Sequence, residues 1–253
     1  MIYAGLDLHK NFLVITMMNS QRREMVEQKK LPNDGEIIKL FQGFNELVVV
    51  AIEATRAWYW LYDLLEVNGI EVKLSHPLKA KAIASARVKN DKIDSRILAH
   101  LLRTDLLPLS YVASKPIRMQ RELLRYWASL VKIQTGIKNR VHVILAKNNI
   151  THSFSDLFGK QGKQFLKYTG WLLMVSLPVL DELEQQIRTV NERIVVSARD
   201  DGEARFLMTI PGVGYYSALL IRSEIGDITL LPLSKAALLL RRTYSLRIFL
   251  REH

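Results

Sequence analysis

Two apolar runs of this chain each end in a carboxylate, and this pattern constrains the fold more than any other feature. Residues 2–6 precede Asp7, and residues 47–52 precede Glu53. Short apolar runs of this kind predict buried β-strands, and we expect the two strands to be neighbours in one sheet. Two buried acids repel each other and lose hydration, so a cation between them would stabilise the pair. The pattern therefore predicts a metal site at the edge of a sheet.

Asp91 and Asp94 supply two further carboxylates at the start of a helix predicted over residues 92–103. Residues with this spacing share a helix face, so both side chains can point at one ion. Carboxylate oxygens are ligands that Mg²⁺ prefers, and Mg²⁺ supports most phosphodiester chemistry. Taken singly, each acid could instead cap or begin a helix. Taken together, Asp7, Glu53, Asp91 and Asp94 predict a catalytic site that binds Mg²⁺ or Mn²⁺.

Strand and helix patterns alternate through the first part of the chain. The expected strands are residues 2–7, 12–18, 24–27, 47–52 and 70–74, and the expected helices are residues 37–44, 55–67, 77–87 and 92–103. This order predicts an α/β domain over residues 1–110, in which helices cover a mixed sheet. Trp58, Tyr59 and Trp60 are expected to pack in a core or between domains, with stacking on nucleic-acid bases as the alternative, and His9 is expected to lie in the turn after the first strand.

Helical patterns replace the strand patterns after this domain. Residues 116–148 have the apolar spacing of one long helix, and a second helix is expected to begin at Pro178 and to reach residue 195. The two helices predict an antiparallel coiled coil or small bundle, which connects the domains over residues 111–200.

Residues 201–253 form the third predicted domain. Gly212 and Gly214 lie there in a turn between two expected helices, which is typical of a helix–hairpin–helix. Glycines in such a turn let backbone N–H groups approach a DNA phosphate. An ordinary αα-hairpin is the alternative interpretation.

The charge of the chain is strongly positive and unevenly distributed. Thirty-six Lys and Arg residues against 25 Asp and Glu residues give a net charge of +11. Residues 115–167 hold eleven of the basic residues and two acids, so this segment is expected to bind nucleic-acid phosphates. A merely basic protein is the alternative. The candidate contacts are Lys10 and Lys92 beside the acids, Arg118, Arg125 and Lys132 in the long helix, and Gly212 and Gly214 in the turn.

The sequence also predicts the compartment. The absence of cysteine excludes disulfides and thiolate metal sites and fits a reducing environment. No apolar run is long enough to span a bilayer, and no signal peptide is visible. We therefore expect a soluble, cytoplasmic protein.

Several motifs together resemble one known family, the DEDD transposases of the insertion-sequence-110 family. The matching segments are Gly5-Leu6-Asp7-Leu8-His9-Lys10, Ile52-Glu53-Ala54-Thr55, Asn90-Asp91-Lys92-Ile93-Asp94-Ser95-Arg96 and Ile210-Pro211-Gly212-Val213-Gly214. The resemblance implies a RuvC-like, ribonuclease-H-type N-terminal domain, a coiled-coil connector and a C-terminal transposase domain. It also implies a site-specific recombinase of an insertion sequence, with Mg²⁺ held by the four acids. DNA, a structured guide RNA and further copies of the chain, as a dimer or higher homo-oligomer, are the implied partners.

The C-terminal segment departs from the family pattern. Members of the family continue beyond Asp227 with a motif that carries a nucleophilic serine, whereas this chain reads differently from Leu230 onward. Back-translation of the last residues yields family-like words in a neighbouring frame, and we hypothesise a frameshift near residues 230–235. No nucleophilic serine is therefore assigned, and Ser234 and Ser245 are poor candidates.

Two alternatives to an active recombinase follow from this departure. The first is a truncated, non-enzymatic protein that binds nucleic acid without exchanging strands. The second is a RuvC-like nuclease that cuts DNA junctions with metal alone. A sugar kinase of related fold is disfavoured, because residues 8–10 read Leu-His-Lys where a glycine-rich phosphate loop is expected.

Overall fold

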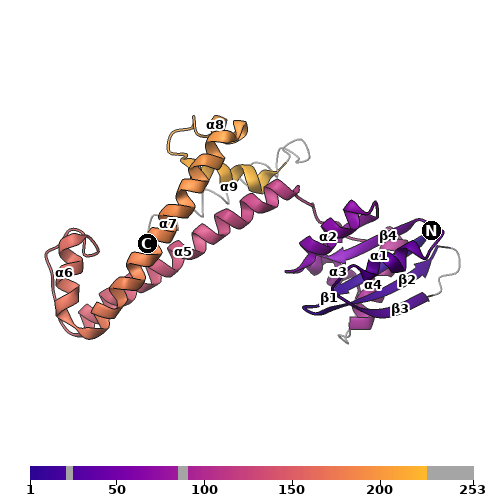
Figure 1. The fold of residues 1–253 in the computed structure, drawn as a ribbon, viewed down its shortest axis with the longest axis horizontal. Coiled ribbons are helices and arrows are strands. Elements are labelled where there is room, and N and C mark those ends of the chain that lie inside the picture. The colour runs from indigo at the N-terminus through magenta and orange to yellow at the C-terminus, as the bar shows by residue number, and fades with distance from the viewer. Residues whose placement is uncertain (21–24, 85–90, 227–253) are drawn as a thin grey trace. The chain divides into compact units, whose positions relative to one another are not determined.

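The computed structural model describes residues 1–20, 25–84 and 91–226, without the side chains of residues 25, 26, 84, 91 and 92. The chain forms two compact units, which Figure 1 shows. The first comprises Met1–Val112, and the second begins at Ala113.

A five-stranded mixed sheet forms the centre of the first unit, as predicted. The strands lie in the order β3-β2-β1-β4-β5. β1 pairs antiparallel with β2, and β2 pairs antiparallel with β3, whereas β1, β4 and β5 run parallel. The bounds are β1 Ile2–Leu8, β2 Phe12–Asn19, β3 Met25–Pro32, β4 Val48–Glu53 and β5 Glu71–Ser75. The third strand is longer than predicted, because its polar residues 28–30 pair with β2.

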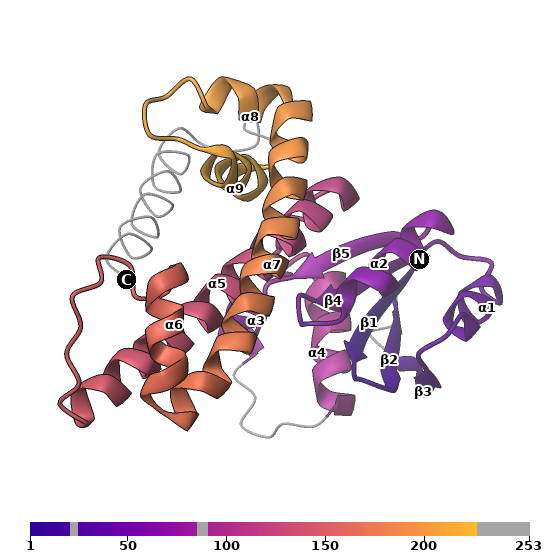
Figure 2. The ribbon, with the colours of Figure 1, turned by 60° about the vertical axis from the view of Figure 1, so that its left-hand side comes forward.

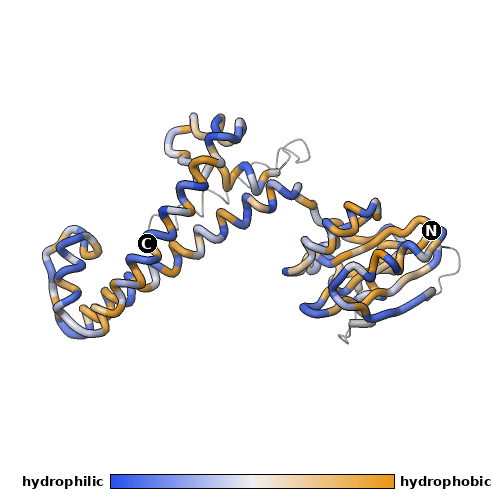
Figure 3. Tube along the Cα trace, viewed as in Figure 1, coloured by the Kyte–Doolittle hydropathy of each residue, from blue (hydrophilic) through white to orange (hydrophobic). Residues whose placement is uncertain are grey.

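Helices cover both faces of this sheet, which makes the unit a three-layer α/β structure (Figure 2). The bounds are α1 Glu36–Gln42, α2 Trp58–Val67, α3 Pro77–Ala84 and α4 Asp91–Arg103. α1 and α2 pack on one face of the sheet and share a hydrophobic core with it. This core contains Ile37 and Phe41 of α1 and Leu61 and Leu65 of α2, and Trp58 belongs to it as predicted. The strands supply the remaining apolar residues of this core, and Figure 3 shows them as hydrophobic.

α4 packs on the opposite face, against β1, β2 and β4. Its backbone lies so close to β1 that a Cβ at Gly5 would overlap the carbonyl oxygen of Ser95 and the amide nitrogen of Ala99. A buried hydrogen bond of 2.8 Å joins the Ser95 hydroxyl to the Thr16 hydroxyl of β2, and the Gln28 amide of β3 donates to Thr16 at 2.9 Å. The start of α4 is therefore fixed to the three antiparallel strands.

The second unit contains a long antiparallel helical pair, as predicted. The bounds are α5 Lys115–Lys147, α6 Lys160–Thr169, α7 Trp171–Asp200, α8 Gly202–Leu207 and α9 Tyr215–Ile225. Leu124 near the start of α5 shares a core with Ile194 near the end of α7, and Leu145 near the end of α5 shares one with Leu173. Figures 1 and 2 show the pair running side by side.

The predicted start of the second long helix was wrong. α7 begins at Trp171, and Pro178 lies inside it. Proline lacks the N–H that would bond one turn back, so an interior proline disfavours a helix. Here Leu173, Leu177 and Leu180 are all buried on one side of α7, and this continuous apolar stripe carries the helix through the proline.

α8 and α9 pack on the same core as the first half of α5 and the last part of α7. Ala204 of α8, Val213 of the turn and Ala218 of α9 are buried in this core with Leu124. The residues on either side of position 200, where the sequence placed a domain boundary, therefore share one hydrophobic cluster. Among the helices that the structure describes, none has the length and apolar character needed to cross a membrane.

Candidate metal and nucleic-acid site

Asp7 and Glu53 lie at the same edge of the sheet. β1 and β4 are parallel, and Leu6 is the register partner of Ile52, so the next residue of each strand is the acid. Side chains alternate between faces along a strand, so Asp7 is on the face of Gly5, which α4 covers. Val49 and Ala51 pack with α4, which places Glu53 on that face as well.

Asp94 approaches this edge from α4. Ser95, near the start of the helix, lies beside Gly5 of β1. Leu102, near the end of the helix, belongs to one hydrophobic cluster with Tyr3 and Val49, which lie closer to the starts of β1 and β4. The first turns of α4, which carry Asp94, therefore lie toward the ends of β1 and β4 at which the two acids stand. The structure thus places Asp7 and Glu53 at one edge of one face and directs the start of α4 toward that edge, while the side chain of Asp91 lies outside the described residues.

Asp7 is mostly buried, and a histidine contacts it. Its side chain is 14% exposed, and Nε2 of His9 lies 3.1 Å from its Oδ2. His9 lies in the turn after β1 as predicted, and its contact with Asp7 was not predicted. Ring contact adds a second constraint, because His9 stacks on Phe12 with 4.5 Å between centroids. The rotamer of Asp7 is therefore held from the side of the turn.

The carboxylates supply hard oxygen donors of the kind that Mg²⁺ and Mn²⁺ take. Within the described part of the chain, His, Asp and Glu residues form no group of three or more that could hold a metal ion. The Asp91 side chain lies outside these described residues, and its spacing in the sequence puts it on the same helix face as Asp94. The donor chemistry of the edge fits a divalent cation.

The turn between β1 and β2 places a cation beside the acids. Lys10 is exposed in this turn. The Asn33 amide donates to the carbonyl oxygens of His9, at 2.8 Å, and Lys10, at 3.0 Å, so the turn is braced against the end of β3. The side chain of the other flanking candidate, Lys92, lies outside the described residues.

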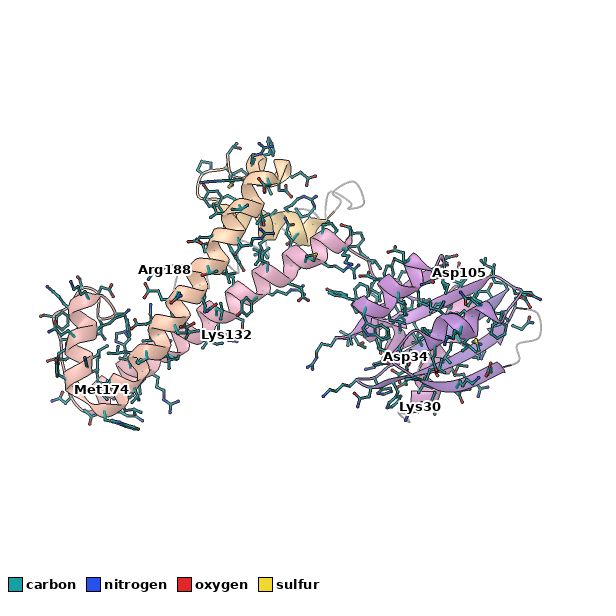
Figure 4. All side chains as sticks on the ribbon, in the orientation of Figure 1. Lys30, Asp34, Asp105, Lys132, Met174 and Arg188 are labelled. Atoms are coloured by element: carbon teal, nitrogen blue, oxygen red, sulfur yellow. The ribbon has the colours of Figure 1, made fainter. Side chains whose placement is uncertain are left out.

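The basic candidates of α5 differ in exposure. Arg118 is buried, with 5% of its surface exposed, which differs from the surface position that the sequence suggested. Arg118 lies in the first turn of α5, and its backbone amide donates a hydrogen bond to the carbonyl oxygen of Ser114. Arg125 is 63% exposed and lies 3.7 Å from Glu224, and Lys132 is exposed and labelled in Figure 4. Arg125 and Lys132 are therefore the members of this set that solvent can reach.

The glycine turn joins α8 to α9, so a helix lies on each side of it. Gly212 has φ +83°, a left-handed conformation that favours glycine. Gly214 caps α9 with extended backbone, and its carbonyl accepts from the Ala218 amide at 2.9 Å. Arg222 of α9 lies 2.6 Å from Glu203 of α8, which holds the two helices together around an exposed turn.

An α/β unit with carboxylates at one sheet edge, followed by a basic helical unit, does not by itself define a function. Comparison with known families makes the assignment specific. The model of a family described as Transposase, the DEDD transposases of the IS110 type, matches residues 4–149, which is more than half of the chain. The chain belongs to this family, as its motifs predicted.

Three curated relatives agree with this assignment. The Sinorhizobium fredii protein named "Putative transposase y4pF/y4sB" is 24% identical over 248 residues, which cover 89% of this chain and 59% of the relative. The Leptospira borgpetersenii "Transposase for insertion sequence element IS1533" is 29% identical over 108 residues, 41% of this chain and 31% of the relative. The Coxiella burnetii "Transposase for insertion sequence element IS1111A" is 23% identical over 193 residues, which cover 72% of this chain and 51% of the relative. The chain thus spans at most 59% of the length of these relatives.

Proposed function

We propose that the chain acts on DNA as the metal-binding and DNA-binding part of an insertion-sequence transposase, a site-specific recombinase. The observation that supports this is the placement of Asp7, Glu53 and the start of α4 at one edge and one face of the sheet. The first unit is ribonuclease-H-like or RuvC-like in this proposal. Three antiparallel strands followed by two parallel ones, in the order β3-β2-β1-β4-β5, support that interpretation.

Asp7, Glu53, Asp91 and Asp94 would hold Mg²⁺ or Mn²⁺ in this function. A bound divalent ion would activate a nucleophile and stabilise charge on the phosphate under attack. The chain's own residues orient the site. His9 holds Asp7, the Thr16–Ser95 hydrogen bond holds the start of α4, and Lys10 contacts phosphate beside the acids.

The second unit contributes the nucleic-acid contacts of the proposal. Exposed Arg125 and Lys132 on α5 bind backbone phosphate, and the turn with Gly212 and Gly214 approaches a second phosphate through backbone N–H groups. A structured guide RNA and a dimer or higher homo-oligomer complete the proposal, and the family membership supports them. Ser234 and Ser245 lie outside the described residues, and no serine nucleophile is proposed.

Manganese binding tests the metal part of the proposal. Mn²⁺ titration followed by electron paramagnetic resonance is expected to show binding by the wild type, and a large loss of affinity in Asp7→Asn and Glu53→Gln. Glu71→Gln is the matched control, because Glu71 is the register partner of Val49 and so lies on the α4 face at the opposite end of the strands. Equal Mn²⁺ affinity in all four proteins would remove the metal assignment.

Strand exchange tests the recombinase part. The purified chain, with donor DNA, target DNA and the element's RNA, is expected to join donor to target in a Mg²⁺-dependent reaction. Binding of DNA without any joining would instead favour the non-enzymatic alternative. Mg²⁺-dependent nicking that survives replacement of every serine would favour the metal-only nuclease.

A further inference from the structure

Lys30 of β3 lies in the same row of the sheet as the acids. The register pairs Lys30 with Val14, and Val14 with Asp7, while Glu53 follows Asp7 on the next strand. Paired residues of neighbouring strands point to the same face, so Lys30 shares the α4 face with Asp7. The neighbouring Gln28–Thr16–Ser95 hydrogen bonds confirm which face this is.

The ammonium group of Lys30 is exposed but held in place. Its Nζ lies 3.6 Å from the centroid of the Phe12 ring, which in turn stacks on His9. His9 contacts Asp7, so a chain of contacts connects the lysine to the acid. Among the residues that the structure describes, no carboxylate forms an ion pair with Lys30 within 4.0 Å. Figure 4 labels this side chain on β3.

Lys29, the preceding residue, has a different setting. It points to the opposite face of the same strand, and its Nζ lies 2.8 Å from Glu27. It is 50% exposed, so solvent reaches both lysines. Lys29 therefore pairs with a carboxylate on the face opposite the acids, whereas Lys30 lies over an aromatic ring on the face that carries the acids.

We infer that Lys30 is a positioning residue that holds a backbone phosphate of the DNA strand lying across the acidic edge. The inference rests on the proposed function, since it needs a DNA strand at the acids. Lys30 lies two strands from Asp7, which is roughly 10 Å between backbones, so it contacts a phosphate other than the one between the acids. Phosphate contacts of this kind fix register without reading sequence.

Two features of the site favour a phosphate over other partners. The acids repel a polyanion, so cations beside them guide the strand, and Lys10 on the turn and Lys30 on β3 both lie on the β2–β3 side of Asp7. Asn33 braces the turn that carries Lys10 against the end of β3, so the backbone segments that carry the two lysines are joined. The competing interpretation is that Lys30 only prevents pairing at an edge strand, which requires no contact with DNA.

Chemical crosslinking can locate the contact, because the chain contains no cysteine. Lys30→Cys and Lys29→Cys each introduce a single thiol on an exposed position of β3. Each variant of the full chain is mixed with duplex DNA that carries a tether ending in an activated mixed disulfide on one backbone phosphate, and thiol–disulfide exchange, which releases the small leaving thiol, is timed. Lys30→Cys is expected to crosslink several-fold faster than Lys29→Cys, with equal rates toward a free small-molecule disulfide.

A charge variant provides the second measurement. Lys30→Met keeps the apolar stem over Phe12 and removes one positive charge. It is expected to lower the slope of log affinity against log salt for duplex DNA by about 0.9, whereas Lys29→Met leaves the slope unchanged. Melting temperatures of both variants equal to that of the wild type show that the sheet is intact.

The outcomes separate this inference from the proposed function. Equal crosslinking rates for the two cysteines, or crosslinking to an RNA probe but not to DNA, overturn the role of Lys30. If the Mn²⁺ titration shows binding while the crosslinking contrast is absent, only this inference fails. If the contrast appears in metal-free buffer while Mn²⁺ binding is absent, the metal assignment fails and the phosphate contact stands.

Discussion

Gly5→Ala is expected to disturb both the stability of the first unit and the proposed metal site. An ideal Cβ at Gly5 would overlap two backbone atoms of α4 and would lie 2.9 Å from Cβ of Leu98. Backbone atoms of a packed helix cannot rotate away as a side-chain tip can, so the helix as a whole must move. Overpacking of this kind costs about 1–3 kcal/mol, and the backbone contacts place this case toward the upper end.

The displacement of α4 has a second effect at the acids. Asp94 moves with the helix, while Asp7 stays on β1, so the carboxylates separate. Mn²⁺ affinity is therefore expected to fall even at temperatures where the variant is fully folded. A loss of about 1.4 kcal/mol of binding free energy corresponds to a tenfold weaker affinity.

Hydrogen exchange followed by mass spectrometry measures the stability effect locally, which matters in a chain of two units. Amides of β1 and α4 are expected to exchange faster in Gly5→Ala, and those of α5 and α7 to keep the wild-type rate. Gly136→Ala is the control, because a Cβ there meets no atom within 4 Å and the residue lies within α5. That change is expected to stabilise α5 by about 0.5–1 kcal/mol. Wild-type exchange in α4 together with wild-type Mn²⁺ affinity in Gly5→Ala would refute the argument.

Three further perturbations test other parts of the structure. Thr16→Val removes the hydroxyl that bonds to Ser95 and Gln28, and it is expected to cost about 1–2 kcal/mol; a double-mutant cycle with Ser95→Ala that shows no coupling would contradict this. Lys163→Met breaks the contacts to Asp181 at 2.6 Å and Glu184 at 3.2 Å that join α6 to α7, at a cost below about 1 kcal/mol because the acids are exposed. The Asp181 hydrogen bond raises the pKa of Lys163 above 10.5, and the Lys163 hydrogen bond lowers the pKa of Glu184 below 4.5. The contribution of this contact is therefore lost as the pH rises through the raised pKa of Lys163 and as the pH falls through the lowered pKa of Glu184. A stability difference between wild type and Lys163→Met that does not shrink as the carboxylates are protonated would refute the assignment. Lys132→Glu on α5 is expected to reduce the salt dependence of DNA binding by about 0.9 in slope or more, and an unchanged slope would place the interface elsewhere.

The sequence predicted the strands of the first unit well because their burial dominates their composition. Residues 2–6 and 47–52 are apolar without interruption, and both became central strands with an acid at the end. The edge strand β3 was predicted too short, since an edge strand tolerates polar residues and loses the apolar pattern. Local composition therefore identifies central strands better than edges.

The positions that depend on register or on partners distant in sequence escaped prediction. Lys30 shares a row with Asp7 only because of how three strands pair, and no spacing along the chain shows this. The buried position of Arg118 and the continuation of α7 through Pro178 likewise arise from contacts with other segments. Asp7 and Glu53 were easier, because each acid interrupts its own apolar run.

The helical pair of α5 and α7 has a separate core at each of its ends. Leu124 and Ile194 belong to the core that supports the glycine turn, while Leu145 and Leu173 belong to the core that supports α6. Adding seven residues to both helices between these cores would move the two ends apart by about 10 Å, since each helical residue adds 1.5 Å. The pair thus acts as a spacer whose length can change in heptad steps while the surfaces at its two ends keep their own packing.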